Sequence, residues 1–371
     1  MFKRCLWFSM VYSVLATPVW ADATVRITGA ILEKVPTQSS GLSVRKSGTP
    51  PMKTIALLRL QLNEQARKGI QHRAQALQTP QESSEDSSSP LPRVVRLGMN
   101  GVPVLDQGAH GTCVTFASTA ALDAIIGQGD YVSQLCPLAL GQYLENQSYL
   151  PSGWDGSWAP YVLQRLIEFG VVSHESEKTT GCGGYYTYPT GMVETLPSLN
   201  NIDEYHAMSQ PADQWMEWTT LLSPIEALND QVNTVQVLRK VKASLAAGDR
   251  VTYGVILQDF DAGVGGAIGS HRVNNDTWVL TPQILRDTIF RPDYSAGHEM
   301  VITGYNDNAV AVDSEGHKHK GLLIVRNSWG DNIGNHGNFY MSYDYFQLLV
   351  LEAHRIRAEV TSHLPDEEAS A

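Results

Sequence analysis

The 371-residue sequence predicts an α+β protein in which a helical part precedes a β-rich part. Three observations support this. Segments with helical periodicity lie mainly between residues 113 and 169, β-branched apolar runs dominate after residue 250, and glycines end several of these segments. Helices gathered in one stretch and strands in another are typical of α+β folds. With 43% hydrophobic and 18% charged residues, the chain can bury a large core.

Residues 1–21 are predicted to be a cleaved secretory signal peptide. Lys3 and Arg4 precede an apolar run over residues 5–16, and Pro18 and a small-residue site follow. An uncleaved anchor is the alternative, but the run falls short of the about 20 residues that span a bilayer. We therefore expect a secreted or periplasmic protein without a membrane anchor.

Residues 22–92 are predicted to be a prosegment and linker, called the leader below. The leader holds nine Lys or Arg and six Asp or Glu, a net charge of +3, whereas the remainder holds 16 and 32, a net of −16. Opposite charges draw the leader to the body, as expected of a removable inhibitory segment. The total charge of −11 argues against a nucleic-acid partner.

Within the leader, residues 53–78 are predicted to form one amphipathic helix, because Ile55, Leu58 and Leu62 recur near helical spacing. Before it, residues 24–35 and 42–45 are compatible with a hairpin. The Ser-rich stretch 79–90 has almost nothing to bury. It is either a cleavage region or an ordinary flexible tether.

Cys113 is a candidate nucleophile because it lies at the predicted start of a helix. That helix is expected to run to Ile126 and to stop at Gly127. The macrodipole and the free amides of a first helical turn stabilise a thiolate and lower its pKa. Such a thiolate can attack a carbonyl carbon, although a cysteine before a helix is, taken alone, more often a small buried hydrophobe.

His298 and Asn327 are the candidate base and its orienting partner. His298 opens a β-rich run, and a buried strand delivers Asn327 at its end, next to Trp329. The amide of Asn327 can accept the imidazole N–H and fix the ring, while the indole shields that hydrogen bond from water. Taken singly, the histidine could be structural and Trp329 could belong to the core.

Together, these segments resemble the papain-like (C1 family) cysteine peptidases. Residues 107–113 follow that family's nucleophile motif, residues 298–305 match its histidine motif, and residues 327–330 match its asparagine motif. The resemblance covers roughly residues 93–351. Three motifs in this order are far more specific than any one of them.

The resemblance implies a helical subdomain (about 93–233) and an antiparallel β-barrel-like subdomain (about 234–361), with the active-site cleft between them. Cys113 and His298 would form a thiolate–imidazolium pair that hydrolyses peptide bonds through a thioester, and Asn327 would orient His298. The side-chain amide of Gln107 and the backbone N–H of Cys113 would form the oxyanion hole. The substrates would be proteins or peptides, and no cofactor is expected.

Three positions depart from the family pattern. His110 stands where many relatives have a disulfide cysteine, and Val114 replaces the usual Trp after the nucleophile, which leaves a smaller wall beside the site. Glu299 replaces a usual Ala. An inward-facing Glu299 carboxylate would stabilise the imidazolium, but we expect this side chain to point to solvent.

Two glycine segments compete for the substrate-facing loop. Residues 181–184 are more similar to the family's loop in residue identity. In the family, however, this loop precedes a helix, and Gly156 and Ser157 lie before the predicted helix 158–169 whereas residues 181–184 lie after it, so chain order favours Gly156 and Ser157. Their exposed backbone could pair with an extended peptide. Trp329 completes the candidate substrate-binding set, and residues 181–184 are then a turn.

Several further expectations concern the rest of the body. Cys136 and Cys182 either form a disulfide, as secretion favours, or remain two buried thiols. Helices are expected over residues 137–147, 158–169 and 234–247, a strand over 251–257, and an insertion beside the cleft over 196–230.

Two stretches invite a ligand-binding interpretation that their patterns do not support. The glycines of residues 263–269 fit neither a dinucleotide-binding nor a P-loop spacing, so a flexible loop is expected. Residues 317–320, with two histidines, fit an exposed hairpin turn better than a metal site, and no metal is predicted. Residues 362–371 are expected to be a disordered tail.

The sequence therefore predicts a secreted, monomeric cysteine endopeptidase made as an inactive precursor. Two rivals remain: a catalytically weak peptide-binding protein on the same scaffold, and an acyl transferase that passes the acyl group to an amine. The acidic body also predicts some preference for basic substrates through electrostatic steering, which salt should weaken.

Overall fold

The computed structural model describes residues 24–37, 51–78, 90–229, 232–258, 267–268, 276–290, 295–313 and 315–358. The helices in these ranges are α1 (Glu64–Gln78), α2 (Cys113–Ile126), α3 (Leu135–Asn146), α4 (Ala159–Phe169), α5 (His174–Thr180), α6 (Ile202–His206), α7 (Thr234–Ala246), α9 (Pro282–Phe290) and α10 (Tyr343–Leu349). The strands are β1 (Val25–Pro36), β2 (Met52–Leu62), β3 (Val94–Arg96), β4 (Met216–Leu222), β5 (Arg250–Gln258), β6 (Ala267–Ile268), β7 (Thr277–Trp278), β8 (Ser295–Asp313), β9 (Lys318–Arg326), β10 (Asn338–Ser342) and β11 (Val350–Ala358).

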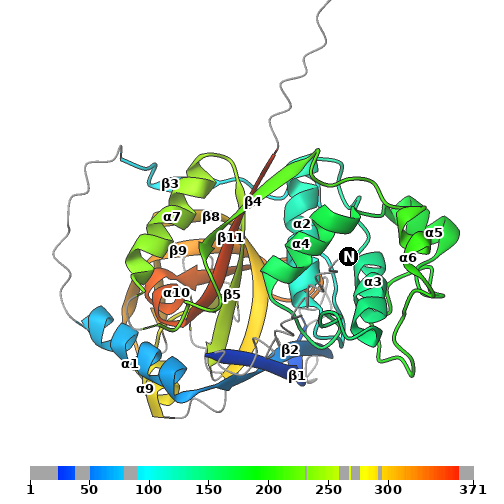
Figure 1. Ribbon diagram of the computed structural model, residues 1–371. Coiled ribbons are helices and arrows are strands. Elements are labelled where there is room, and N and C mark those ends of the chain that lie inside the picture. Colours follow the sequence, from blue (N-terminus) through cyan, green and yellow to red (C-terminus); the bar gives the residue numbers. More distant parts are fainter. Residues whose placement is uncertain are drawn as a thin grey trace, which may run out of the picture.

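A largely antiparallel sheet forms the centre of the molecule, in the order β4-β11-β5-β8-β9-β10-β7. Of the described pairings, only that of β10 with β7 is parallel. Helices α2 and α4 lie on one side of β5 and β11, and α7 and α10 lie on the other (Figure 1). Because it is covered from both sides, β5 is buried along its whole length. The predicted α+β class is confirmed.

The helical part is built as its sequence periodicity predicts. Helices α2, α3, α4 and α7 confirm the four predicted helices to within two residues at each end. Gly127 ends α2 with φ = 73°, a left-handed conformation that glycine adopts without steric penalty. Helices α3, α5 and α6 stand farther out (Figure 1), and α3 and α6 contribute to a separate small core. In that core Cys136 and Cys182 form a disulfide with a Cα–Cα distance of 5.2 Å.

The leader folds onto the body, but not as one helix. Residues 52–62 form β2, and only residues 64–78 form a helix, so the prediction of a helix over residues 53–78 is wrong for its first part. The run Ile55–Leu58 is buried without a break. A continuous apolar run of this kind suits a strand that is covered on both faces, and tertiary contacts decide between the two periodicities.

The predicted hairpin has the correct first strand and the wrong second one. Strand β1 pairs with β2 from Val25↔Leu62 to Pro36↔Met52, so residues 52–62 take the place expected for residues 42–45. The latter lie outside the described residues, as do the signal peptide, residues 79–89 of the linker and the tail. Figure 1 shows the β1–β2 hairpin and α1 running along one side of the body.

The stretch over residues 196–230 contributes to the sheet as well as to the helical part. It contains α6 and also β4, which pairs with β11. Residues 181–184 form the predicted turn, closed by a bridge between Cys182 and Tyr185. Of the glycine loop 263–269, only the short strand β6 is described.

The chain turns between β8 and β9, but residues 318–320 already belong to β9, so the prediction of a turn over residues 317–320 is wrong except for residue 317. Nor is this stretch exposed throughout. The His319 side chain is buried, and its Nδ1 lies 2.9 Å from Asp344 Oδ2. In the described part of the chain, no group of three or more His, Cys, Asp or Glu is placed to hold a metal ion. Nor is any helix there long and apolar enough to cross a membrane.

Candidate active site

Three segments bring Cys113, His298 and Asn327 into one buried region. Cys113 is the first residue of α2, which packs against β8. His298 lies near the start of β8, and Asn327 directly follows β9, the neighbouring strand. All three side chains are almost fully buried. The sheet order thus places His298 beside Asn327, and the helix that packs over them begins with Cys113.

His298 is held by an amide and an indole. Its Nε2 lies 2.7 Å from Oδ1 of Asn327, and its ring stacks on Trp329 with centroids 4.6 Å apart. Because an amide oxygen only accepts, Nε2 carries the proton, and in the neutral ring Nδ1 is the free base. Nδ1 is buried and has no hydrogen-bond partner among the described residues. Burial lowers the pKa of His298 to about 4, which Asn327 partly opposes.

The Cys113 thiol lies against the backbone of Glu299, the residue after His298. Burial raises the pKa of the Cys113 thiol far above its ordinary value, against the smaller opposing effect of the Glu299 and Val114 backbone amides. A raised thiol pKa and a lowered imidazole pKa both favour the uncharged forms of the two groups while they are buried.

The side-chain amide of Gln107 lies between the body and the leader. Its Oε1 accepts a hydrogen bond from Ser328 Oγ at 2.7 Å. Its Nε2 donates to the carbonyl oxygen of His110 at 2.9 Å and to that of Ala56, in β2, at 3.2 Å. A peptide carbonyl of the leader thus occupies the donor expected to serve a substrate carbonyl.

Sequence patterns did not identify two residues that position Gln107. Ser328 fixes its side chain, and the hydroxyl of Tyr188 donates to its backbone carbonyl at 2.9 Å. The Tyr188 hydroxyl also lies 2.8 Å from Oγ1 of Thr112, the residue before Cys113. Ser328 belongs to the asparagine motif and could have been found there. Tyr188 lies in an irregular, turn-rich stretch without periodicity, so no sequence signal marks it.

His110 and Val114, two of the positions that depart from the family pattern, are both packed into the interior. The buried ring of His110 meets Trp154 edge-on with centroids 5.1 Å apart, and its Nε2 lies 2.9 Å from the Gly191 carbonyl oxygen. Burial lowers the pKa of His110. Aromatic packing thus stabilises the segment before Cys113, where the expected bridge cysteine is missing. Val114 is buried in the main core.

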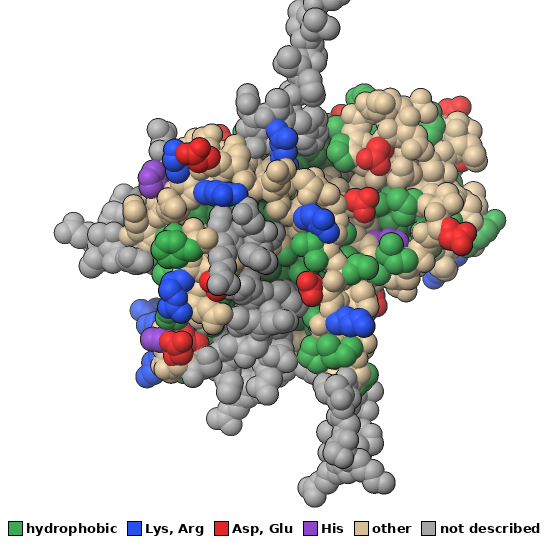
Figure 2. Space-filling model, turned by 90° about the horizontal axis from the view of Figure 1, so that it is seen from below, with side chains coloured by type: hydrophobic (Ala, Val, Ile, Leu, Met, Phe, Trp, Pro, Cys, Tyr) green, Lys and Arg blue, Asp and Glu red, His purple; other side chains and the backbone are tan. Residues whose placement is uncertain are grey.

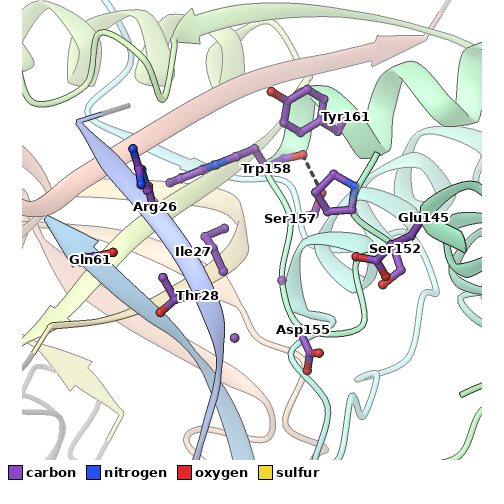
Figure 3. A pocket seen from close by; sticks show the side chains of 13 residues that line it. Arg26, Ile27, Thr28, Gln61, Glu145, Ser152, Asp155, Ser157, Trp158 and Tyr161 are labelled. Atoms are coloured by element: carbon purple, nitrogen blue, oxygen red, sulfur yellow. Dashed lines mark hydrogen bonds between the residues drawn. The ribbon is translucent and has the colours of Figure 1, made fainter. Parts of the chain in front are cut away.

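Gly156 and Ser157 line a cavity of about 460 Å³ together with residues of the leader. Figure 3 shows Ile27 and Thr28 of β1 on one side and the segment that leads into α4 on the other. A Cβ atom on Gly156 would lie 2.5 Å from Ile27 Cγ2 and 3.0 Å from Leu58 Cδ2, so glycine permits this close approach. The leader therefore occupies the space in front of the predicted substrate-facing loop.

The prediction that Glu299 points to solvent is wrong, because its side chain is buried. It meets the carboxyl group of Glu352, whose Oε2 lies 2.9 Å from His354 Nε2 and whose Oε1 accepts the Ala159 amide at 3.1 Å. Gly254 makes room, since a Cβ there would lie 2.8 Å from Glu299 Oε2. Burial, and then the Glu352 carboxylate, raise the pKa of Glu299 well above its usual range.

This carboxyl pair predicts a pH-dependent stability. Glu299 keeps its proton in the folded state while the unfolded side chain loses it near pH 4.5, so the free energy of unfolding should fall as pH rises above 4.5. The slope per group approaches about 1.4 kcal/mol per pH unit. Glu299→Gln should flatten this slope, as measured by urea unfolding between pH 4.5 and 7.5. Equal slopes in both proteins would show that Glu299 does not retain its proton.

Residues 232–369 match the model of the Peptidase C1-like family. This segment contains His298 and Asn327, so the relationship to papain-like peptidases that the motifs predict is confirmed there. No curated protein matches the chain.

Several solved structures are similar at low identity. Xylellain, a cysteine protease from Xylella fastidiosa, is 18% identical over 73% of this chain and 87% of its own, with a TM-score of 0.45. Digestive procathepsin L 3 of the Tenebrio molitor larval midgut is 16% identical over 80% and 79%, with a TM-score of 0.43. Bromelain from Ananas comosus, in complex with the E64 inhibitor, is 17% identical over 72% and 100%, with a TM-score of 0.41.

Proposed function

We propose that this chain is the precursor of an exported cysteine endopeptidase, with Cys113 as nucleophile and His298 as base. The observation that carries the proposal is the orientation of His298. Its Nε2 is bound to Asn327, and its buried Nδ1 has no hydrogen-bond partner among the residues that the structure describes. His298 lies on a strand packed against the helix that starts at Cys113. A purely structural histidine would use both ring nitrogens or expose one of them to water.

The proposed reaction begins when the substrate replaces the leader. His298 Nδ1 takes the proton of Cys113, and the thiolate attacks the peptide carbonyl carbon. The oxyanion accepts hydrogen bonds from Gln107 Nε2 and the Cys113 backbone N–H, and each such donor is worth about 3 kcal/mol in the transition state. The imidazolium then protonates the leaving amine, which leaves a thioester on Cys113. Water, deprotonated by His298, releases the acid product and restores the thiol.

The leader is proposed to inhibit this reaction in three ways. Ala56 occupies the Gln107 donor, Ile27 and Leu58 fill the space in front of Gly156, and burial keeps both Cys113 and His298 uncharged. Opposite net charges of leader and body support the same arrangement. The Cys136–Cys182 disulfide supports folding in an oxidising compartment, in line with the N-terminal signal pattern.

Arg73 on α1 is the anchor that we expect to keep the leader in place. Its buried guanidinium donates to the carbonyl oxygens of Leu348 at 3.0 Å, of Val350 at 2.8 Å, and of Ala227. Burial lowers the pKa of Arg73 to about 9. All three acceptors belong to the body, so they regain water as partners when the leader detaches.

Replacing Arg73 by methionine should release the leader more often. Each buried carbonyl left without a donor costs about 1–3 kcal/mol in the closed state only. We expect the peptidase activity of the uncut precursor to rise at least about tenfold, a change of 1.4 kcal/mol in the opening equilibrium. Lys68→Met is the matched control, since Lys68 lies on the same helix in an exposed pair with Glu64. A folded Arg73→Met precursor as inactive as the control would contradict the anchoring role.

The proposed function is tested with leader-free enzyme, obtained by folding the full precursor and then cutting it at a protease site inserted in residues 79–90. Cleavage of an unfolded protein at internal peptide bonds would support the endopeptidase. An added amine nucleophile separates hydrolysis from acyl transfer, because a transferase would give amide products in place of free carboxylates. Folded leader-free enzyme that cleaves nothing would contradict the proposal.

A further inference from the structure

Lys53 of the leader places its ammonium group in a small acceptor site on the body. Its Nζ donates to the carboxylate of Asp106 and, at 2.8 Å, to the carbonyl oxygen of Trp329. The Lys53 side chain is only 20% exposed. The ammonium group is thus held by one charged and one neutral oxygen in a partly closed site.

Body residues alone build this acceptor site. Asp106 and Trp329 lie opposite each other in an isolated β-bridge, and the Gly330 N–H donates to Leu105 O at 2.9 Å. Asp106 Oδ1 accepts the Gly108 N–H at 3.0 Å, which leaves Oδ2 for Lys53. These bonds do not involve the leader, so the same two acceptors remain when the leader is gone.

The site also has room for a cation. Gly330 has φ = 82°, and a Cβ atom there would lie 2.9 Å from Lys53 Nζ. The same Cβ would lie 3.4 Å from Asp106 Oδ2 and 3.5 Å from Asn332 Oδ1, so oxygen atoms line this spot. A side chain at residue 330 would close the space that the ammonium group occupies.

The acceptor site lies at one end of the segment that β2 covers. Along β2, Lys53 meets Asp106 and Trp329, Ala56 meets Gln107, and Leu58 approaches Gly156. Trp329 also stacks on His298, which must protonate the leaving amine. Residues on the amine side of the scissile bond therefore pass the Trp329 end of the cleft, and those on the acyl side pass the Gly156 end.

We propose that Asp106 and the Trp329 carbonyl form a specificity subsite for a lysine or arginine side chain of the substrate, on the leaving-amine side of the scissile bond. In the precursor, Lys53 occupies this subsite. The proposal rests on the proposed peptidase function and adds a position-specific preference to it. It differs from general electrostatic steering, which depends on net charge and not on position.

Figure 2 shows the molecule from below, the side on which the leader lies in Figure 1. Acidic and basic side chains of the described residues are interspersed on this face, without a broad field of one sign. A local acceptor pair acts at one substrate position, whereas the overall charge of −11 acts on the substrate as a whole.

The test uses leader-free enzyme and quenched peptides that differ at one position. Lys, Gln or Glu is placed in turn at each residue on both sides of the scissile bond, and kcat/KM is measured. For a partly exposed charge pair we expect Lys to be preferred over Gln by about fivefold at one amine-side position only. Asp106→Asn should bring this ratio close to one, and Asp106→Lys should favour Glu. Because ratios are compared within each variant, a change in overall activity cancels.

Asp213→Asn is the matched control, an identical chemical change at an exposed residue just before β4. It should keep the wild-type Lys preference. Equal cleavage of Lys and Gln peptides at every amine-side position, or a preference that survives in Asp106→Asn, overturns the subsite while leaving the peptidase intact. Cleavage of no peptide by folded leader-free enzyme overturns the proposed function and the subsite with it.

Discussion

Replacing Cys113 by alanine is expected to lower kcat of the leader-free enzyme by at least about 10⁴-fold, to the level that binding and the oxyanion donors give without a nucleophile. His298, Asn327 and Gln107 are retained, so the loss isolates the covalent step. The measurement is kcat on a quenched peptide, together with a urea unfolding midpoint to show that the variant is folded. Activity retained in folded Cys113→Ala would assign the chemistry to another group.

Replacing Asn327 by alanine is expected to reduce activity less than replacing Cys113 does. Without its amide, the His298 ring loses the acceptor at 2.7 Å that fixes its tautomer. Asn327→Ala should therefore be slower than wild type but faster than Cys113→Ala. This ranking distinguishes a positioning residue from the nucleophile.

Removing the leader is expected to raise the alkylation rate of Cys113 by iodoacetamide at least about 100-fold at pH 7. In the precursor the thiol is fully buried, and burial raises its pKa while lowering that of His298 to about 4. Once water enters, the thiol pKa falls and the imidazole pKa rises, which favours the ion pair. At a pH below the thiol pKa, each unit by which that pKa falls raises the alkylation rate about threefold. The larger thiolate fraction outweighs the lower nucleophilicity of each thiolate.

The pH dependence of alkylation shows whether removal of the leader lowers or raises the pKa of the Cys113 thiol. In the leader-free enzyme the rate should persist to lower pH than in the precursor, because a thiolate paired with an imidazolium forms below the ordinary thiol pKa. Cys136 and Cys182 do not react while they are bridged, and Cys5 lies in the predicted signal peptide, so Cys113 is the site labelled when both forms are made without residues 1–21. Equal rates and equal profiles in both forms would mean that the leader does not control the thiol.

The fold of the body follows from local sequence signals. Helix α2 is apolar with a glycine stop, and the strand run at Val251–Leu257 is continuous and β-branched, so both could be predicted. The leader was harder to predict because the run over residues 53–62 fits helical spacing as well as a covered strand. Only its tertiary contacts with β1 and with Gly297 of β8 decide between them.

In the site, too, the residues could be predicted from local motifs, whereas their contacts with residues distant in the sequence could not. Ordered motifs single out Cys113, His298 and Asn327, and the structure places them in one buried region. The orientation of Glu299 could not be predicted, because its burial depends on Glu352, which is 53 residues away in the sequence and two strands away in the sheet. Nor could a sequence pattern show that Ala56 and Lys53 meet Gln107 and Asp106.

The most direct test of the account is mass analysis of an unfolded protein incubated under reducing conditions with three samples: intact precursor, leader-free enzyme and leader-free Cys113→Ala. We expect internal cleavage by the leader-free enzyme, much less by the precursor, and no detectable cleavage by Cys113→Ala. Cleavage that survives in Cys113→Ala, or folded leader-free enzyme that leaves the substrate intact, would contradict it.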